Sequence, residues 1–123
     1  QGIIKNNPNN LNAQVLDALT LQQMGQPKEA LNRLNLIVSA HPDNVDALTT
    51  RANVEFNLGL YAMARADYDT LIQLQPDDSG YLIERAKALL QLGEKKLAQK
   101  DLKKAISMGV PQGLVHPLLL QAK

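Results

Sequence analysis

Cysteine is missing from all 123 residues of this chain, and tryptophan is missing with it. Without cysteine the chain has no disulfide framework, no thiolate nucleophile and no cysteine-ligated zinc or iron–sulfur site. Aromatic residues make up only 3% of the sequence while hydrophobic residues reach 45%, so the core must consist of Leu, Ile, Val and Ala. A core of that composition is typical of helical proteins.

The chain also lacks an excess of charge of either sign. Thirteen lysines and arginines stand against twelve aspartates and glutamates, and the net charge of +1 creates no long-range field that would attract a phosphate backbone or anionic lipid. No apolar stretch approaches the roughly 18 residues that a membrane span requires. We therefore predict one ordinary domain with no nucleic acid partner and no membrane insertion.

The first residue is Gln1 and not Met, which is typical of a processed or shortened chain. A targeting segment would then be absent from the sequence, so the cellular compartment stays unknown at this stage.

A period of 34 residues runs through the chain. The recurring residues are Gly25, Gly59 and Gly93, then Ala18, Ala52 and Ala86, and also Ala30, Ala64 and Ala98. Pro42 and Pro76 keep the same interval, whereas Pro111 comes one residue late because Val110 occupies the expected position. Three copies of one unit therefore fill most of the chain.

Each unit predicts two helices with a turn between them. In the middle copy, apolar and small residues recur every three or four positions on both sides of Gly59. Gly59 is the expected helix C-cap, because glycine adopts the left-handed conformation without the penalty that a Cβ brings. Pro42 and Pro76 are expected to end the second helices. The candidate N-caps of the helices that follow are Asp43, Asp77, Asp78 and Ser79.

The recurring alanines predict close helix packing. Ala52 in the first helix and Ala64 in the second are small where two antiparallel helices joined by a short turn must approach each other. A larger side chain at either position would push the two helices apart.

The middle copy resembles the tetratricopeptide repeat family. The resemblance rests on Arg51-Ala52-Asn53, Phe56, Leu58-Gly59, Tyr61, Ala64, Asp67-Tyr68, Leu71-Ile72, Leu74 and Pro76. Two departures are Gln14, where the first copy should carry a large apolar residue, and Glu55, where the second should carry an aromatic one. The resemblance implies an all-α fold, a right-handed superhelix of three helix-turn-helix repeats at about residues 11–44, 45–78 and 79–112 of a single domain.

Residues 113–123 do not continue the repeat and are expected to form a short capping helix. Leu114, Leu118 and Leu119 would cover the last hydrophobic face from one side of that helix, and Pro117 would keep it short. The alternative is that these leucines pack on further sequence or on another chain.

In function, the resemblance implies a non-enzymatic interaction module that binds a protein or peptide in its concave groove. The expected groove residues are Val15, Leu19, Gln22, Thr49, Asn53, Phe56, Asn57, Ile83, Lys87, Leu90 and Gln91. Asn53 and Asn57 lie four residues apart, and their amides match the alternating donors and acceptors of an extended peptide. Phe56 and Leu90 would hold an apolar side chain and Lys87 a carboxylate. The competing interpretation is that all of these are ordinary solvated helix residues.

One subtype of the family is disfavoured. Modules that clamp the carboxylate tail of heat-shock chaperones need lysine, asparagine, asparagine, lysine and arginine on successive first helices. The matching positions here are Val15, Leu19, Thr50, Gly80 and Glu84. Since Glu84 replaces an arginine, it would repel the tail that the clamp attracts.

Catalytic and metal-binding patterns are not found. His41 and His116 each precede a proline and have no partner at metal-ligand or catalytic spacing, so we predict no enzyme activity, no metal and no cofactor. Asp77 and Asp78 are better explained as helix caps than as paired catalytic carboxylates. The five lysines from Lys95 to Lys104 are expected to form a solvated face, because no aromatic residue is interleaved for base stacking. The alternative is that they bind an acidic protein partner.

The module is expected to be a monomer or a weak homo-oligomer. A second hypothesis makes it a structural segment of a longer repeat protein, or a scaffold that self-associates through the leucines after Pro117.

Overall fold

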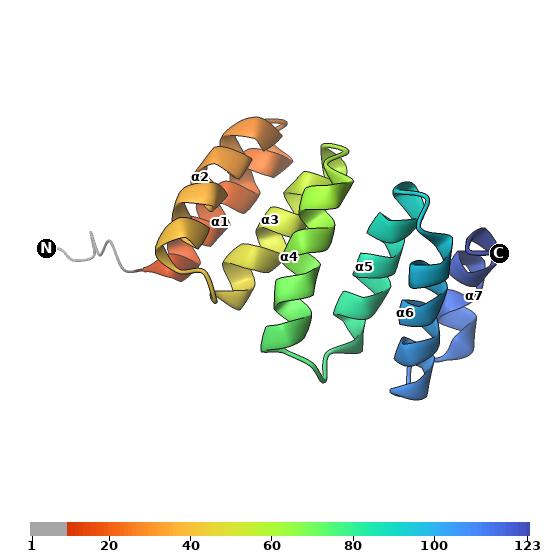
Figure 1. Ribbon diagram of the computed structural model, residues 1–123. Coiled ribbons are helices and arrows are strands. Elements are labelled where there is room, and N and C mark those ends of the chain that lie inside the picture. The colour runs from red at the N-terminus through yellow and green to blue at the C-terminus, as the bar shows by residue number, and fades with distance from the viewer. Residues whose placement is uncertain (1–9) are drawn as a thin grey trace, which may run out of the picture.

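The computed structural model describes residues 10–123 and contains only helices within that range. They are α1 (Leu11–Gln23), α2 (Pro27–Ala40), α3 (Val45–Asn57), α4 (Tyr61–Leu74), α5 (Ser79–Gln91), α6 (Lys95–Ser107) and α7 (Gln112–Gln121). The pairs α1–α2, α3–α4 and α5–α6 stack side by side along one direction, and α7 lies at the C-terminal end (Figure 1). The predicted all-α superhelix of helix pairs is confirmed.

The turn inside each pair depends on its glycine. Gly25, Gly59 and Gly93 have φ values of 81°, 80° and 80°, in the left-handed region that favours glycine. After α3, the Gly59 amide donates to the Phe56 carbonyl at 3.0 Å and the Leu60 amide donates to the Glu55 carbonyl at 2.8 Å. These bonds satisfy carbonyls that the helix end leaves free, so the predicted capping role is confirmed.

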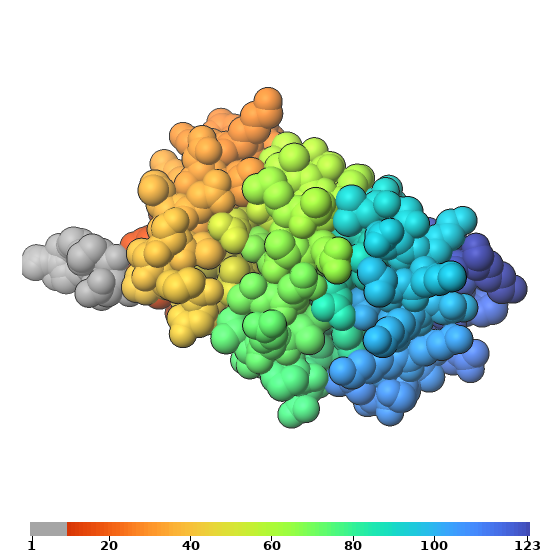
Figure 2. All heavy atoms as spheres, viewed as in Figure 1, coloured from red at the N-terminus to blue at the C-terminus, as the bar shows by residue number. Residues whose placement is uncertain are grey.

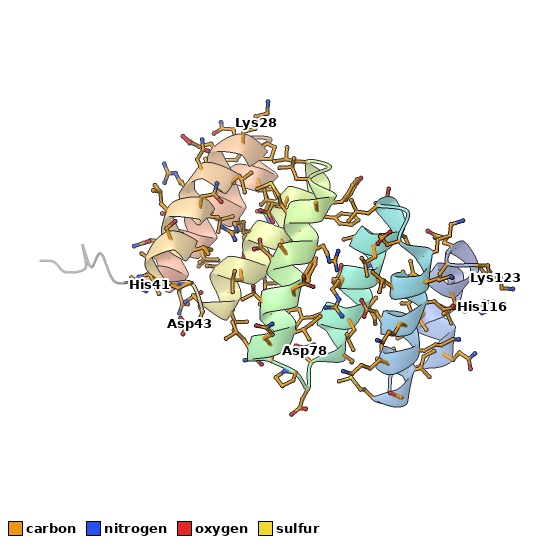
Figure 3. All side chains as sticks on the ribbon, in the orientation of Figure 1. Lys28, His41, Asp43, Asp78, His116 and Lys123 are labelled. Carbon is orange, nitrogen blue, oxygen red and sulfur yellow. The ribbon has the colours of Figure 1, made fainter. Side chains whose placement is uncertain are left out.

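Helix N-termini are capped by residues that the sequence analysis identified only in part. The side chains of Asn10, Asn44 and Asp78 accept hydrogen bonds from the free amides of α1, α3 and α5. The prediction that Asp43 caps α3 is wrong, because Asn44 is the residue directly before the first turn of that helix. Asp78 is the confirmed candidate, and it lies in the connection between α4 and α5, as Asp43 lies between α2 and α3 (Figure 3).

The core is divided between the two ends of the stack. One cluster joins buried residues of α1 to α4, and a second joins α5, α6 and α7. The alanines that recur at 34 residues, namely Ala18, Ala30, Ala52, Ala64, Ala86 and Ala98, are all completely buried. In the space-filling view the helix pairs form one elongated body whose outer surface runs from α2 to α6 (Figure 2).

The C-terminal helix α7 covers the end of the stack, as predicted, but with different residues. Val115 is fully buried against α5 and α6, and Leu118 and Leu119 pack partly buried beside it. Leu114 was expected in this contact and is instead 70% exposed, because residues 115, 118, 119 and 122 share the packing face.

Pro117 does not keep α7 short. The helix continues for four residues beyond it, to Gln121. The amide that proline lacks would have bonded the carbonyl of Gly113, and both residues are exposed, so water can satisfy that carbonyl.

Candidate functional site

The first helices of the three pairs form the inner layer of the array. Helix α1 contacts α3 directly, in addition to its own partner α2. The positions expected to line the groove recur on α1, α3 and α5 with the spacing of one helix face. We call this surface the inner face.

The N-terminal half of the inner face contains a hollow of about 550 Å³. It is lined by Asn12, Val15, Leu16, Asp46, Thr49, Thr50 and Tyr81, so three first helices contribute to it. Val15 and Thr49 are the predicted groove residues that this hollow brings together. Sequence reasoning missed Tyr81, whose hydroxyl lies 3.4 Å from the Thr49 hydroxyl and connects α5 to α3 across the hollow. Asp46 supplies the one formal charge of the lining.

The middle of the inner face presents amides. Asn53 and Asn57 are both exposed on α3, one turn apart. The Asn53 carbonyl oxygen accepts a 3.4 Å hydrogen bond from the Tyr68 hydroxyl, which orients the amide and directs its nitrogen away from Tyr68. Tyr68 is itself buried, and this burial, together with the charge of Glu84, raises the pKa of its phenol.

Phe56 is anchored to the turn of its own helix pair. Its ring meets the ring of Tyr61 edge to face, with centroids 5.0 Å apart and an interplanar angle of 72°. Because it also packs against the first core cluster, only part of Phe56 is open to a ligand.

The third copy contributes a mixed surface. Ile83 and Leu90 are half-buried against the second core cluster, and Gln91 is exposed. The Lys87 ammonium lies 3.3 Å from the Glu84 carboxylate on the same helix, and both side chains are 41% exposed. Of the remaining predicted residues, Leu19 and Gln22 are half-buried on α1.

A buried ionic cluster behind the inner face connects neighbouring pairs. The Arg51 guanidinium donates to both carboxylate oxygens of Asp67, at 2.9 Å and 2.6 Å, and to the Asn35 side chain at 3.2 Å. The bond to Asp67 raises the pKa of Arg51. Since Asn35 belongs to α2, this arginine joins the first pair to the second.

The next junction repeats the arrangement. Arg85 donates to both oxygens of Asp101, at 2.8 Å and 2.7 Å, and to Asp69 of α4 at 2.9 Å. These bonds raise the pKa of Arg85. Sequence reasoning did not identify these links, although the 34-residue spacing of both the arginines and their aspartates was a signal that could have revealed them.

Glu55 is a buried carboxyl within the first ionic cluster. Its side chain is 1% exposed, one oxygen lies 3.8 Å from Arg51 Nε, and the other has no hydrogen-bond partner. Burial, reinforced by the neighbouring Asp67 carboxylate, raises the pKa of Glu55 to about 9. The carboxyl therefore holds its proton at neutral pH.

Residues 10–123 show no arrangement that indicates a metal site or a membrane span. His41 lies near the N-terminal end of the stack and His116 near the C-terminal end, so the two imidazoles do not meet (Figure 3). Within the described range, no three side chains of the His, Cys, Asp and Glu types are grouped in a way that would hold a metal ion. No helix from α1 to α7 has the length and apolarity needed to cross a bilayer.

Stacked helix pairs, a capped end and an inner face with an open hollow define a helical repeat protein. Profiles of the tetratricopeptide repeat match residues 16–79 and 79–108. The chain belongs to the tetratricopeptide repeat family. Among known proteins it is similar to the human DnaJ homolog subfamily C member 3, at 33% identity over 82 residues. That match covers 67% of this chain and only 16% of the relative's length.

Solved structures with similar folds include three tetratricopeptide repeat or chaperone domains. A tetratricopeptide repeat protein from Parabacteroides merdae has a TM-score of 0.82 and 27% sequence identity, and the match covers 94% of this chain and 46% of the Parabacteroides chain. The first repeat domain of Spaghetti (RPAP3), bound to the HSP90 peptide SRMEEVD, has a TM-score of 0.79, 20% identity and coverage of 89% and 87%. The Yersinia enterocolitica secretion chaperone SycD, in complex with a peptide of the translocator YopD, has a TM-score of 0.75, 17% identity and coverage of 91% and 86%.

Proposed function

We propose that this protein is a non-enzymatic interaction module that binds a peptide or an extended protein segment along its inner face. The observation that carries the proposal is the 550 Å³ hollow, which stays open between α1, α3 and α5 although apolar and hydrogen-bonding groups line it. The repeats at about 11–44, 45–78 and 79–112 would act as one domain, with residues 113–123 as its cap.

The chemistry of the hollow indicates the kind of segment that fits. Val15 and Leu16 offer apolar surface, Thr49 and Tyr81 offer hydroxyls, and Asp46 offers a carboxylate. A segment with an apolar side chain next to a lysine or arginine would use all of these groups. Farther along, Asn53 and Asn57 would bond its main chain, because each amide can both donate and accept.

The C-terminal part of the inner face is less suited to a carboxylate than its lysine suggests. Lys87 is already paired with Glu84, so a ligand carboxylate would have to compete with Glu84 for the ammonium. This arrangement supports the proposal that the module is not a clamp for chaperone tails. The other clamp positions hold Val15, Leu19, Thr50 and Gly80, none of which carries a positive charge.

The test begins with a partner peptide selected from a random phage-displayed library on the immobilised domain. Calorimetry would then measure its Kd for the native domain and for an Asn53→Ala, Thr49→Ala double variant. We expect micromolar affinity, about 8 kcal/mol, and a clear loss in the double variant. The matched control is Gln73→Ala, which changes an exposed amide on α4.

Two results would contradict the proposal. Equal affinity in the double variant and the control would place the ligand elsewhere. Binding of the peptide SRMEEVD with the affinity of the selected ligand would show that the module is a chaperone-tail clamp after all.

A scaffold function through self-association is the second candidate. It is favoured by Leu114 and Leu120 of α7, which are 70% and 50% exposed on the outer side of the cap. Light scattering over a concentration series distinguishes the two functions. A mass that rises with concentration and returns to the monomer in Leu114→Glu supports the scaffold, whereas a constant monomer mass excludes it.

A further inference from the structure

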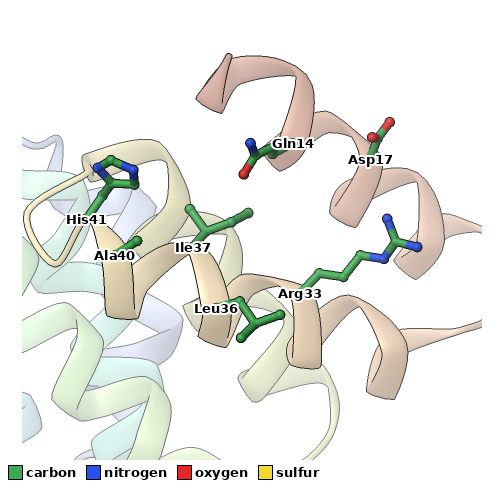
Figure 4. Close-up of a pocket in the computed structure, with 7 residues that line it drawn as sticks. All are labelled: Gln14, Asp17, Arg33, Leu36, Ile37, Ala40 and His41. Carbon is green, nitrogen blue, oxygen red and sulfur yellow. The ribbon is translucent and has the colours of Figure 1, made fainter. Parts of the chain in front are cut away.

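The N-terminal end of the stack carries a second hollow, of about 470 Å³, that is separate from the inner face. Its lining includes Asp17 of α1 and Arg33, Leu36, Ile37, Ala40 and His41 of α2 and its C-terminal end. The Arg33 side chain extends from α2 toward α1, and Leu36 lies below it (Figure 4). We call these six residues the N-terminal face.

The repeat period shows what this face corresponds to in the rest of the chain. By the 34-residue period, the position of Asp17 is equivalent to those of Arg51 and Arg85. By the same period, the position of Arg33 is equivalent to those of Asp67 and Asp101. At both internal junctions the second helix of the preceding pair, α2 or α4, packs on the first helix that carries the arginine. That covering helix supplies the acceptor for the arginine, which is Asn35 in one case and Asp69 in the other.

The charges of the N-terminal face are inverted relative to both internal junctions. Asp17 stands where the arginines stand, and Arg33 stands where the buried aspartates stand. Both are exposed, and neither forms an ion pair with any other residue from 10 to 123. A helix like α4 would therefore place its Asp69 carboxylate against a second carboxylate, which is unfavourable.

The same face exposes apolar surface. Leu36 is 73% exposed and occupies the position that Thr70 and Lys104 hold in the other pairs. Beside it, Ile37 is nearly buried within the first core cluster and forms the floor of the hollow together with Ala40. An exposed leucine beside two unpaired opposite charges is the pattern of a site for an amphipathic helix.

We propose that the N-terminal face binds an amphipathic helix of a partner protein, seated on α1 as α2 is seated on α3. The partner helix carries a lysine or arginine at the position of Asn35 and Asp69, where it meets Asp17. An apolar residue covers Leu36, and a carboxylate one or two turns away meets Arg33. Charge complementarity thus selects a partner that the internal junctions would reject.

The probe for this test is a synthetic peptide of residues 61–75, the α4 segment, with a hydrocarbon staple between the exposed positions 62 and 66. It is made with the native Asp69 and with Asp69→Lys. Fluorescence anisotropy measures the Kd of each peptide for the full chain and for its Asp17→Arg variant. Circular dichroism verifies that this exposed substitution leaves the fold intact.

The native chain should bind the Asp69→Lys peptide about fivefold more tightly than the Asp69 peptide, as expected for a partly exposed ion pair. In the Asp17→Arg chain the order should reverse. Leu36→Glu should weaken both peptides, whereas Asn53→Ala on the inner face should change neither.

Three results would overturn the proposal. They are the absence of binding at millimolar peptide, a preference that does not depend on residue 17, and a loss of binding in Asn53→Ala with none in Leu36→Glu. The last would place the peptide on the inner face, so the two sites can fail independently.

Discussion

Glu55 is an acidic residue at a buried position that is apolar in the other two repeats. The equivalent positions of the other copies hold Leu21 and Leu89, which contribute to the core. Glu55 is as buried as Leu89 and more buried than Leu21, and among residues 10–123 only Arg51 stands near its carboxyl as a counter-charge. Since Arg51 already binds Asp67 with two hydrogen bonds, it cannot fully compensate a second buried carboxylate.

This imbalance predicts a pH dependence of stability. The pKa of Glu55 is about 9 in the folded chain, against 4.5 without burial, so the folded state holds a proton that the unfolded state releases over that interval. The free energy of unfolding should therefore fall as the pH rises from about 4.5 to about 9. Glu55→Leu should reduce this slope and raise the stability at pH 8.5 by about 1–3 kcal/mol.

Urea unfolding of the native chain and Glu55→Leu at pH 5.5 and 8.5 measures the effect. The other titrating groups are shared, so the difference between the two slopes isolates Glu55. Parallel slopes in the two proteins would show that the carboxyl ionises normally.

Alanine substitutions at two glycines distinguish the effect of backbone strain from the effect of packing. At Gly59 an added Cβ would meet no atom within 4 Å, but the φ of 80° is unfavourable for alanine. Gly59→Ala should cost about 1–2 kcal/mol, whereas Gly113→Ala, at an open helical position of α7, should gain about 0.5–1 kcal/mol. Thermal unfolding compares the two variants, and a loss at Gly113 as large as at Gly59 would contradict the role of φ.

For single residues, the structural role can be predicted from the sequence where the residue recurs with the repeat period, and cannot be predicted where it does not recur. Gly59 was predicted because two other glycines share its interval. Gly109, with a φ of 111°, lies outside that interval and was missed. Glu55 was noted as a departure, but its burial depends on side chains from another helix, which local spacing does not specify.

Among the elements, the helix pair is the unit whose packing the sequence predicts best. Ala64 on α4 is completely buried, and α3 and α4 are in extensive contact. Ala64→Leu should cost about 1–3 kcal/mol through overpacking. Ala62→Leu is the matched control, because Ala62 is exposed on the same helix. Guanidinium unfolding reports both, and similar stability of the two variants would refute close packing at Ala64.

The cap α7 shows where prediction of an element fails. Its existence followed from the leucines after Gly113, and Leu118 and Leu119 were assigned to its packing face correctly, but Leu114 was assigned to it instead of Val115. The error is one residue, and on a helix one residue is a rotation of about 100°. A ten-residue segment that contains a proline has too few periodic positions to fix that rotation.

For the whole molecule, the question is how the repeats are held in one cooperative unit. The stack has separate core clusters for α1–α4 and for α5–α7. Arg85 crosses between them, because it joins Asp69 of α4 to Asp101 of α6 while its own backbone lies in α5. In repeat proteins, stability depends on such nearest-neighbour contacts as much as on the repeats themselves.

The inner face could be predicted as a surface but not as a site. Asn53, Asn57 and Lys87 lie on the helices where they were expected. The pairing of Lys87 with Glu84 and the bridge from Tyr81 to Thr49 depend on rotamers and on the offset between repeats. Neither quantity is encoded in the spacing of residues along one helix.

The role of Arg85 can be measured against a neighbouring arginine that shares one of its partners. Arg85→Met leaves the buried Asp101 without its counter-ion and should cost about 3–5 kcal/mol. Arg65→Met removes a surface pair with the same Asp69, 3.6 Å apart, and should cost less than about 1 kcal/mol. Hydrogen exchange should show that α5–α7 opens before α1–α4 in Arg85→Met only. If the two variants lose equal stability and exchange uniformly, the ionic clusters do not couple the repeats, and packing alone holds them together.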